Sequence, residues 1–499
     1  MKAIINIAAA AASALLLTMC APSVPADYTA LSEQAKIYPD YAGITMPVNI
    51  APLNFNILDS ADNYVTHIHA KGEEGIVTGG ATADFDEAKW KELLQKHQGD
   101  TLYVDIYAQR QGKWQRYPAI KMAVAEEIDP YISYRQIEPS YIGFEVMRIC
   151  QRNLENFDEK EIFNNCTLNE DVSGQCINCH SYQDYNRTGN MQMHVRVNHG
   201  GTVIMKDGEI KKVNLKTPAT ISAGVYPSWH PTLPLIAYSN NTTNQTFHSL
   251  NTNKVEVQDA ASDIILYDVD KNEVSIIAND STELETFPYW SPDGNWLYYV
   301  SSYIPKFATE EEVTAYKTSH YEDYKYNIYR KPFDQATRSF GATDTVFMAS
   351  ERGGSATFPR VSPDGKYLLF TMAPYGTFHI WHKDADLYLM DLATREIRNL
   401  AEANSDDVES YHSFSTNGRW IIFSSRREDG SYTRLYITHF DENGRASKPF
   451  LLPQKDPEQN HQLYKSYNIP EFMVAPATPT RQQLIDAISS DAIDVKLKN

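Results

Sequence analysis

The clearest chemical pattern in this sequence is five residues long: residues 176–180 read Cys-Ile-Asn-Cys-His. C-x-x-C-H is the covalent attachment signature of a c-type haem, in which two thiols add to the vinyl groups and the histidine binds the iron. With 5 Cys and 14 His in 499 residues, random placement would give this pattern on the order of 10⁻³ times per chain. The sequence therefore predicts one covalent haem c on Cys176 and Cys179, with His180 as the proximal iron ligand.

Other uses of a C-x-x-C pair fit less well. A thioredoxin-like redox pair follows a buried strand, whereas residues 171–175 are a polar turn. A structural zinc site needs two further ligands, which Cys150 and Cys166 could supply, although they are not a second close-spaced pair. A disulfide between Cys150 and Cys166 is compatible with an oxidising compartment and with the haem hypothesis.

The second axial ligand decides what the iron does. Residues 191–199 follow the motif closely enough for the chain to return over the far face of the haem. Methionine would raise the reduction potential, and histidine would lower it. We rank Met191 first and His194 second, with Met193 and His199 below them. Arg196 could pair with a haem propionate. If the sixth position stays open, the iron could instead bind peroxide or a diatomic gas.

The N-terminus carries a targeting segment. Residues 4–17 are apolar apart from Asn6 and Ser13, a run too short for a membrane span and typical of a signal peptide. The run ends in Leu-Thr-Met-Cys, which resembles a bacterial lipoprotein processing site with Cys20 as the lipidated residue, although its methionine departs from the usual small residue. Cleavage after residues 24–26, Val-Pro-Ala, is the alternative and would remove Cys20. We expect a signal peptide over residues 1–20 and a lipid-anchored protein of the periplasm or outer membrane.

The composition narrows the class of partner. The net charge of −19 argues against nucleic acid, because phosphate binding relies on clustered Lys and Arg. The 42% of hydrophobic residues is ample for a buried core. No later segment is long and apolar enough to cross a bilayer, so we expect membrane contact only through the anchor at Cys20.

An internal repeat occupies the C-terminal half of the chain. Each copy joins an aromatic-proline step, a Ser-Pro-Asp-Gly turn and an apolar strand, best seen at residues 287–300 and 358–370 and less perfectly at 226–238 and 411–423. Proline fixes the first φ of the turn and Asp-Gly tolerates its later angles, so each copy predicts a hairpin. Further strands follow each hairpin, and four strands per copy make a propeller blade.

The spacing of the copies predicts insertions. The aligned positions Trp229, Trp290, Val361 and Phe414 lie 61, 71 and 53 residues apart, longer than the roughly 40–50 residues of a bare blade. We expect the extra residues near 240–257 and 303–324. A hairpin over residues 201–213 begins a further blade that the C-terminal stretch could complete, giving five or six.

The repeat resembles the β-propeller repeats of the TolB-like, WD40-like (PD40) family over residues 220–455. This resemblance implies a binding scaffold with loops around one face of a central funnel, and it does not imply an enzyme. A propeller behind one C-x-x-C-H also resembles a group of exported TolB-like proteins of Bacteroides-type bacteria, through residues 152–157, 176–182 and 467–472. That likeness implies architecture and export.

The sequence before the motif predicts a separate folding unit. Strand-like runs alternate with turns up to residue 122, interrupted by one amphipathic helix at 85–97. We therefore expect a mainly β protein: a small β-rich domain over 28–125, a linker and short haem segment over 126–200 with a short helix near 158–163, a propeller over 201–475 and a tail over 476–499.

These patterns predict an exported monohaem cytochrome on a TolB-like propeller, an electron carrier or binding protein rather than a catalyst, with envelope redox or assembly proteins as partners. The alternative is an envelope binding or assembly propeller in which the haem is structural or absent. A haem peroxidase or sensor is a second alternative, and it requires an open iron site.

Overall fold

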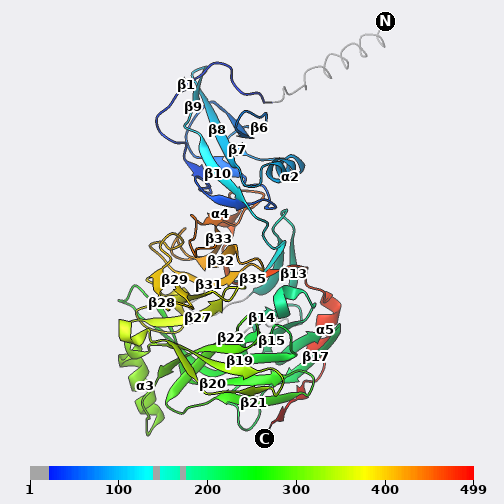
Figure 1. The fold of residues 1–499 in the computed structure, drawn as a ribbon, viewed down its shortest axis with the longest axis vertical. Helices are drawn as coiled ribbons and strands as arrows, with labels where there is room; N and C mark the ends of the chain where they lie inside the picture. The colour runs from blue at the N-terminus through cyan, green and yellow to red at the C-terminus, as the bar shows by residue number, and fades with distance from the viewer. Residues whose placement is uncertain (1–21, 139–145, 169–175, 499) are drawn as a thin grey trace, which may run out of the picture.

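The structure, a computed structural model, describes residues 22–138, 146–168 and 176–498. The predicted signal peptide with Cys20 lies outside these residues. Figure 1 shows a small N-terminal unit standing on a larger ring of sheets. Strands dominate both, which confirms the mainly β fold class. Among the described residues no helix has the length and hydropathy needed to cross a membrane.

The N-terminal unit is the expected β-rich domain. Its larger sheet has seven strands and its smaller sheet three. The expected helix is confirmed as α2, Glu87–Lys96, whose first turn is capped by Asp86 and which buries Trp90 against the sheets. The strands are β1 Thr29–Ala30, β3 Thr45–Pro47, β5 Asn63–Ala70, β6 Ile76–Gly79, β8 Thr101–Arg110, β9 Lys113–Arg116 and β10 Ile120–Ala125 in the larger sheet, and β2 Ile37–Tyr38, β4 Phe55–Ile57 and β7 Thr82–Ala83 in the smaller.

The larger unit is a six-bladed β-propeller. Each blade has four antiparallel strands, of which the first named lines the funnel and the last lies at the outer edge. Blade one is β14 Cys176–Tyr182, β15 Met191–Arg196, β16 Gly201–Lys206 and β17 Glu209–Asn214; blade two is β18 Val225–Trp229, β19 Leu235–Phe247, β20 Val255–Asp268 and β21 Glu273–Ala278; blade three is β22 Glu283–Trp290, β23 Trp296–Tyr303, β24 Asn327–Asp334 and β26 Asp344–Phe347, with β25 Ser339–Phe340 beside β24. Blade four is β27 Ser355–Val361, β28 Tyr367–Ala373, β29 Asp386–Asp391 and β30 Ile397–Asn399; blade five is β31 Glu409–Phe414, β32 Trp420–Ser425, β33 Arg434–His439 and β34 Phe450–Leu451; blade six is β35 Ser466–Met473, β11 Tyr131–Ile137, β12 Met147–Asn153 and β13 Glu159–Asn164.

Blade six closes the ring with strands from both ends of the propeller sequence. Its inner strand β35 pairs antiparallel with β11, from Tyr131 opposite Met473 to Ile137 opposite Ser466. Residues 126–200, expected as a linker and haem segment, therefore supply three strands of blade six and the two inner strands of blade one. The short helix expected near 158–163 is wrong: this stretch is β13, which pairs with β12 across a tight hairpin.

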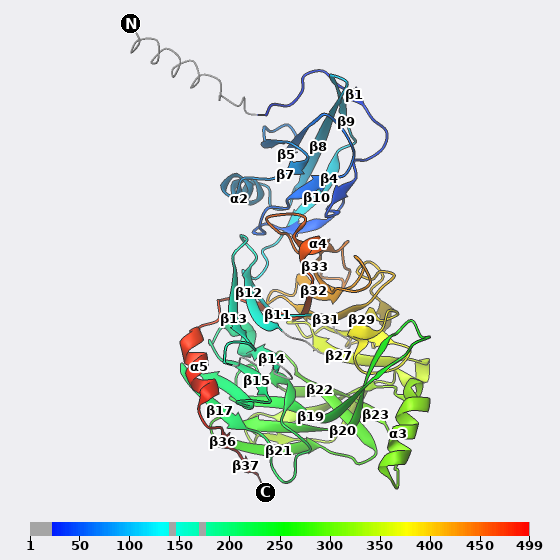
Figure 2. The same ribbon diagram turned by 180° about the vertical axis from the view of Figure 1, so that it is seen from behind.

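The insertions and the tail are ordered around the ring. The insertion after residue 240 extends the β19–β20 hairpin, and the one after 303 forms α3, Glu310–Ser319. In the tail, α5 (Arg481–Ser489) packs on blade one, while β36 Ile493–Asp494 and β37 Lys496–Leu497 add parallel edges to β17 and β21. Figure 2 shows the tail running down the outside of these two blades. The remaining short helix, α4 Gln459–Gln462, precedes β35.

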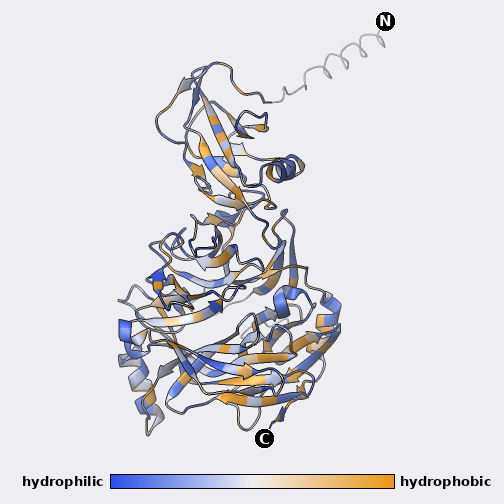
Figure 3. Ribbon diagram, viewed as in Figure 1, coloured by the Kyte–Doolittle hydropathy of each residue, from blue (hydrophilic) through white to orange (hydrophobic). Residues whose placement is uncertain are grey.

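The two units share one hydrophobic core. The core of the N-terminal domain continues into Trp420 and Phe450 of blade five and Tyr467 of blade six. The indole of Trp420, fully buried, donates a hydrogen bond to the Glu127 carbonyl at 3.1 Å. In Figure 3 hydrophobic residues line the strands of both units, whereas α3 is mostly hydrophilic. The units are therefore packed together as one body rather than tethered.

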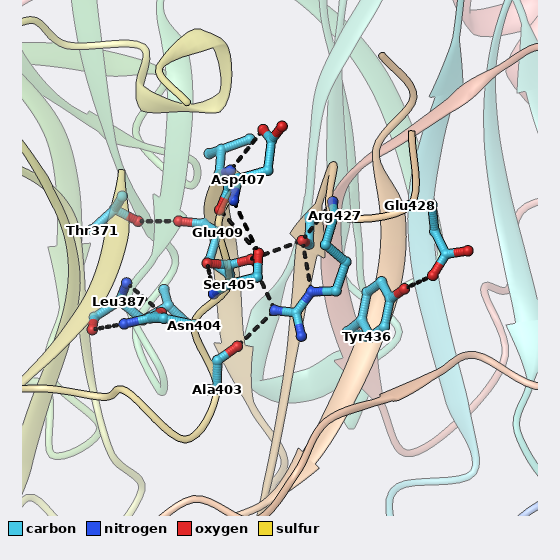
Figure 4. Close-up of polar contacts among 12 residues, drawn as sticks. Thr371, Leu387, Ala403, Asn404, Ser405, Asp407, Glu409, Arg427, Glu428 and Tyr436 are labelled. Carbon is cyan, nitrogen blue, oxygen red and sulfur yellow. Dashed lines mark hydrogen bonds and ion pairs between the residues drawn. The ribbon is translucent and has the colours of Figure 1, made fainter. Parts of the chain in front are cut away.

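A polar network ties blade four to blade five. The carboxylate of Glu409, which has no exposed surface, accepts hydrogen bonds from Ser405, Ser425 and Arg427, the last at 2.8 Å. Figure 4 shows these side chains converging on the carboxylate, with Arg427 also reaching the Ala403 carbonyl. Burial raises the pKa of Glu409, and the charge of Arg427 opposes the shift.

Candidate functional site

The inner strand of every blade contains the same irregular backbone position, which we call the step. Each inner strand contains one residue with a left-handed backbone, φ between 48° and 54°, at a shift in strand register. This combination is a β-bulge, which bends the strand and turns the next side chains toward the axis. The six residues are Cys179, Tyr226, Phe287, Phe358, Tyr411 and Ile469.

Four of these six positions are aromatic and touch around the axis. The ring centroids of Tyr226 and Phe287 are 4.7 Å apart, those of Phe287 and Phe358 4.1 Å, and those of Phe358 and Tyr411 4.9 Å. Blade one supplies Cys179 at this position and blade six supplies Ile469. Because both side chains are smaller than an aromatic ring, the ring of aromatics is open on the side of these two blades.

The six step residues border a cavity at the centre of the propeller. The cavity holds about 1330 Å³ when its open mouth is counted. Cys179 and His180 lie in its wall together with aromatic side chains from blades two to five. One guanidinium and two carboxyl side chains, those of Arg360, Asp184 and Glu471, also line it. Burial raises the pKa of Glu471 to about 8 although Arg360 opposes the shift.

The two cysteines of the motif are buried thiols. Cys176 is 5% exposed and Cys179 3% exposed, and the Sγ of Cys176 lies 3.9 Å from the Sδ of Met147. Burial raises the pKa of both thiols, while the positive charges of Arg196 and Arg135 oppose the shift. Both sulfurs are therefore protonated in the folded chain at neutral pH and almost closed to solvent.

His180 is the least satisfied polar side chain of the motif. It is 1% exposed, and neither ring nitrogen has a hydrogen-bond partner among the described residues. Burial lowers its pKa to about 3, the charge of Arg135 lowers it further, and the Ser133 backbone opposes the shift. The ring is thus neutral, with an unshared electron pair available to a metal ion.

The candidates for the second axial ligand lie elsewhere on blade one. Met191 and Met193 are 2% and 0% exposed in a core shared with Met147 and Met205. His194 Nδ1 is 3.2 Å from the Thr202 hydroxyl, and burial lowers the His194 pKa to about 3.

His199 is exposed beyond the end of β15. Of the described residues, the wall of the cavity contains Cys179 and His180 but none of these four candidates. Which residue binds the far side of the iron stays a prediction.

The other two cysteines of the described chain stand apart from the motif. Cys150 is buried on β12 and Cys166 follows β13, and the structure contains no disulfide between them, the pairing that the sequence left open. Within the described ranges no three cysteines cluster closely enough to hold a metal ion, which leaves the zinc alternative without a site there.

Sequence reasoning missed that the motif is itself a copy of the repeat. Residues 179–182 read Cys-His-Ser-Tyr, which aligns with Tyr-His-Ser-Phe at 411–414 and with Tyr-Pro-Ser-Trp at 226–229. The serine followed by an aromatic residue was the signal that could have placed β14 on the funnel. Arg360 and Glu471 of the cavity wall were also missed, because nothing local marks them as neighbours.

Comparisons with known proteins find one partial relative among curated proteins and distant neighbours among solved structures. No family model matches the chain. A stretch of 141 residues is 30% identical to the Tol-Pal system protein TolB of Wolinella succinogenes and covers 28% of each protein. The chain is therefore TolB-like over less than a third of either protein.

Solved structures are more distant. The β-propeller domain of the Pyrococcus furiosus trilobed protease is 11% identical, with a TM-score of 0.33 over 85% of this chain and 99% of that one. A Mycobacterium tuberculosis puromycin-hydrolyzing peptidase is 10% identical, with a TM-score of 0.36 over 63% of this chain. The chain spans only 44% of that peptidase.

Proposed function

We propose that this protein is an exported c-type haem protein, in which one haem is attached to Cys176 and Cys179 with His180 as its proximal ligand. In this proposal Cys179 and His180 would hold the haem from the cavity wall, and the bound haem would supply electron exchange with partners in the cell envelope. The observation that carries the proposal is His180, a buried and neutral imidazole without a well-aligned hydrogen bond to any described residue, directly after two buried thiols in C-x-x-C-H spacing.

The residues present fit a haem in donor set and surroundings. Both thiols are available for thioether bonds, and the imidazole is neutral. The guanidinium groups of Arg135 and Arg196 act on the thiols electrostatically, so they lie where they could offset the two propionate carboxylates. A bound haem would supply one-electron redox chemistry.

The residues around the motif hold its backbone in place. Arg135 donates a hydrogen bond to the side-chain oxygen of Asn178, and Gln192 donates one to the Cys179 carbonyl. Because both thiols are buried in the closed blade, attachment has to precede the packing of blade one against blade six. The proposal thus makes haem loading a step in the folding of the propeller.

Location and partners follow the same proposal. A protein loaded with haem c is exported, and we propose a lipid anchor at Cys20. The TolB relative belongs by its name to the Tol-Pal system, and the partial likeness supports an envelope location with envelope proteins as partners.

The test is an optical spectrum and an intact mass of the full chain expressed with haem-attachment machinery. We expect the mass of one haem and reduced c-type bands, both lost in Cys176→Ala/Cys179→Ala and retained in the matched control Cys150→Ala. His180→Ala should keep the covalent haem and shift the bands. A low-spin resting spectrum excludes the open-site peroxidase or sensor; colourless protein without added mass refutes the proposal.

A second function is favoured by the cavity wall. The aromatic step residues form a largely apolar funnel that also carries the cation of Arg360 and the carboxyls of Asp184 and Glu471, which suits an apolar peptide segment of an envelope assembly protein. In this alternative the Cys-His pair is only the first blade's copy of the repeated step. Arg360→Ala and Tyr289→Ala would then abolish crosslinking to that partner in the envelope, whereas Cys176→Ala/Cys179→Ala would leave it unchanged.

A further inference from the structure

We infer that the N-terminal domain holds a binding site for a divalent transition-metal ion, with Zn²⁺ the best match, formed by His67, His69 and Asp105. His67 and His69 alternate along β5 and so share one face of the sheet. Asp105 on β8 lies directly opposite His67 in the strand register. The three ligand atoms lie within 4.8 Å of one another.

The hydrogen bonds of His69 call for a cation between its ring and Asp105. Its Nδ1 lies 2.8 Å from the Ala70 carbonyl and its Nε2 3.2 Å from Asp105 Oδ2. A neutral imidazole has only one N–H, so one ring nitrogen would point an unshared electron pair at an oxygen. A metal ion bound by both Nε2 and Oδ2 would remove this repulsion.

His67 completes the set of donors. Its ring stacks on that of His69, with centroids 4.2 Å apart and planes inclined by 18°. Its Nε2 is directed at the Glu74 carbonyl, and a proton on that nitrogen leaves Nδ1 as the lone-pair atom. An outer hydrogen bond of this kind commonly fixes the tautomer of a metal-binding histidine.

Arg116 orients the carboxylate. Its Nη2 donates to Asp105 Oδ1 at 2.7 Å, which leaves Oδ2 facing the histidines. Metal-binding carboxylates are usually held in this way by a second residue. The positive charge of Arg116 also lowers the affinity for a cation, so we expect weaker binding than in a site with an unshared carboxylate.

The ligand types and exposure identify the class of ion. Two imidazoles and one carboxylate are a common ligand set of open zinc sites, whereas Ca²⁺ and Mg²⁺ prefer oxygen ligands only. The side chains of His69 and Asp105 are 17% and 7% exposed, so a fourth position stays accessible to water. The site is independent of the proposed haem function and lies on the other unit of the molecule.

The experiment is calorimetric titration of the full mature chain with Zn²⁺, supported by the visible spectrum of bound Co²⁺. We expect one site, and a loss of affinity of at least about tenfold in His67→Ala, His69→Ala and Asp105→Asn. Exposed His320, hydrogen-bonded to Asp323, provides the matched control His320→Ala, which should bind as the wild type does.

Two further readouts separate this site from the cysteines and from misfolding. Cys176→Ala/Cys179→Ala should keep the Zn²⁺ affinity, and bound Co²⁺ should lack thiolate charge-transfer bands. Zn²⁺ should raise the unfolding temperature of the wild type and not that of Asp105→Asn. If His67→Ala does not fold, His67→Gln replaces it as the variant that lacks this ligand. Unchanged affinity in the three ligand variants, or no Zn²⁺ binding to the wild type, overturns the inference.

Discussion

His180 in blade one and His412 in blade five occupy the same step of the propeller, each directly after a left-handed residue of the inner strand. The Nε2–H of His412 donates to the Leu369 carbonyl of blade four at 3.1 Å. Ser133 has the position of Leu369 in blade six, since the two lie opposite the equivalent residues Glu471 and Arg360. His412 thus links two blades by a well-aligned hydrogen bond, whereas His180 faces the Ser133 backbone without a contact of standard hydrogen-bond geometry.

This difference predicts unequal costs of removing the two rings. In a haem-free background carrying Cys176→Ala/Cys179→Ala, His412→Ala should lower the unfolding free energy by about 1–3 kcal/mol, because it leaves a buried carbonyl without a donor. His180→Ala in the same background should cost less. Urea unfolding measures both. Equal losses would mean that His180 is a blade-linking residue like His412, which favours the partner-binding alternative.

The buried histidines also predict a dependence of stability on pH. Burial lowers the pKa of His379 and His412 to about 3, whereas both titrate near 6.5 in the unfolded chain. Between these values the unfolded state binds protons that the folded state does not, so the contribution of each histidine to stability falls as the pH falls. Each adds a slope of up to about 1.4 kcal/mol per pH unit.

Burial raises the pKa of two carboxyls, that of Glu285 to about 7 and that of Asp259 to about 6. Because their contribution to the pH dependence of stability opposes that of the histidines, the effect of one histidine is measured as the difference between a variant and the wild type. His412→Gln keeps a donor for the Leu369 carbonyl and removes the titration. Its unfolding free energy should fall less than that of the wild type between pH 6.5 and pH 4. Parallel curves for the two proteins would contradict the assignment.

Thiol counting distinguishes haem loading from an empty motif. In denaturant, haem-loaded protein should show only the thiols of Cys150 and Cys166, whereas haem-free protein should add those of Cys176 and Cys179. In the native haem-free protein only Cys166 should react rapidly with a thiol reagent, because the other three are buried. Rapid reaction of Cys176 or Cys179 would show that blade one is open in solution.

Much of the fold could be predicted from local sequence. Proline, aspartate and glycine in one turn dictate a hairpin wherever they occur, so blades three and four were recognisable from residues 287–300 and 358–370. Blade six could not be found in this way, because Ile132 and Phe472 are paired across the whole length of the propeller. No local sequence pattern indicates with which distant strand a given strand pairs.

The candidate site was only partly predictable for a related reason. Spacing marks the Cys and His of the motif, but the cavity exists only because six bulges, from Cys179 to Ile469, meet at one axis. The His67, His69 and Asp105 cluster depends likewise on strand register. Alternation along β5 could have suggested two of its members, whereas Asp105 joins them through the pairing of β5 with β8.

The network between blades four and five predicts a non-additive pair of mutations. Arg427→Ala removes the cation beside the fully buried Glu409 carboxylate and should cost about 3–5 kcal/mol of unfolding free energy. Adding Glu409→Gln should restore part of this loss, because no buried charge then remains to be compensated. Glu402→Ala at the exposed Arg398–Glu402 pair is the control and should cost at most about 1 kcal/mol. Urea unfolding of the wild type, Arg427→Ala, Glu409→Gln and the double variant gives the coupling energy, and strictly additive losses would show that the ion pair does not stabilise the junction between the two blades.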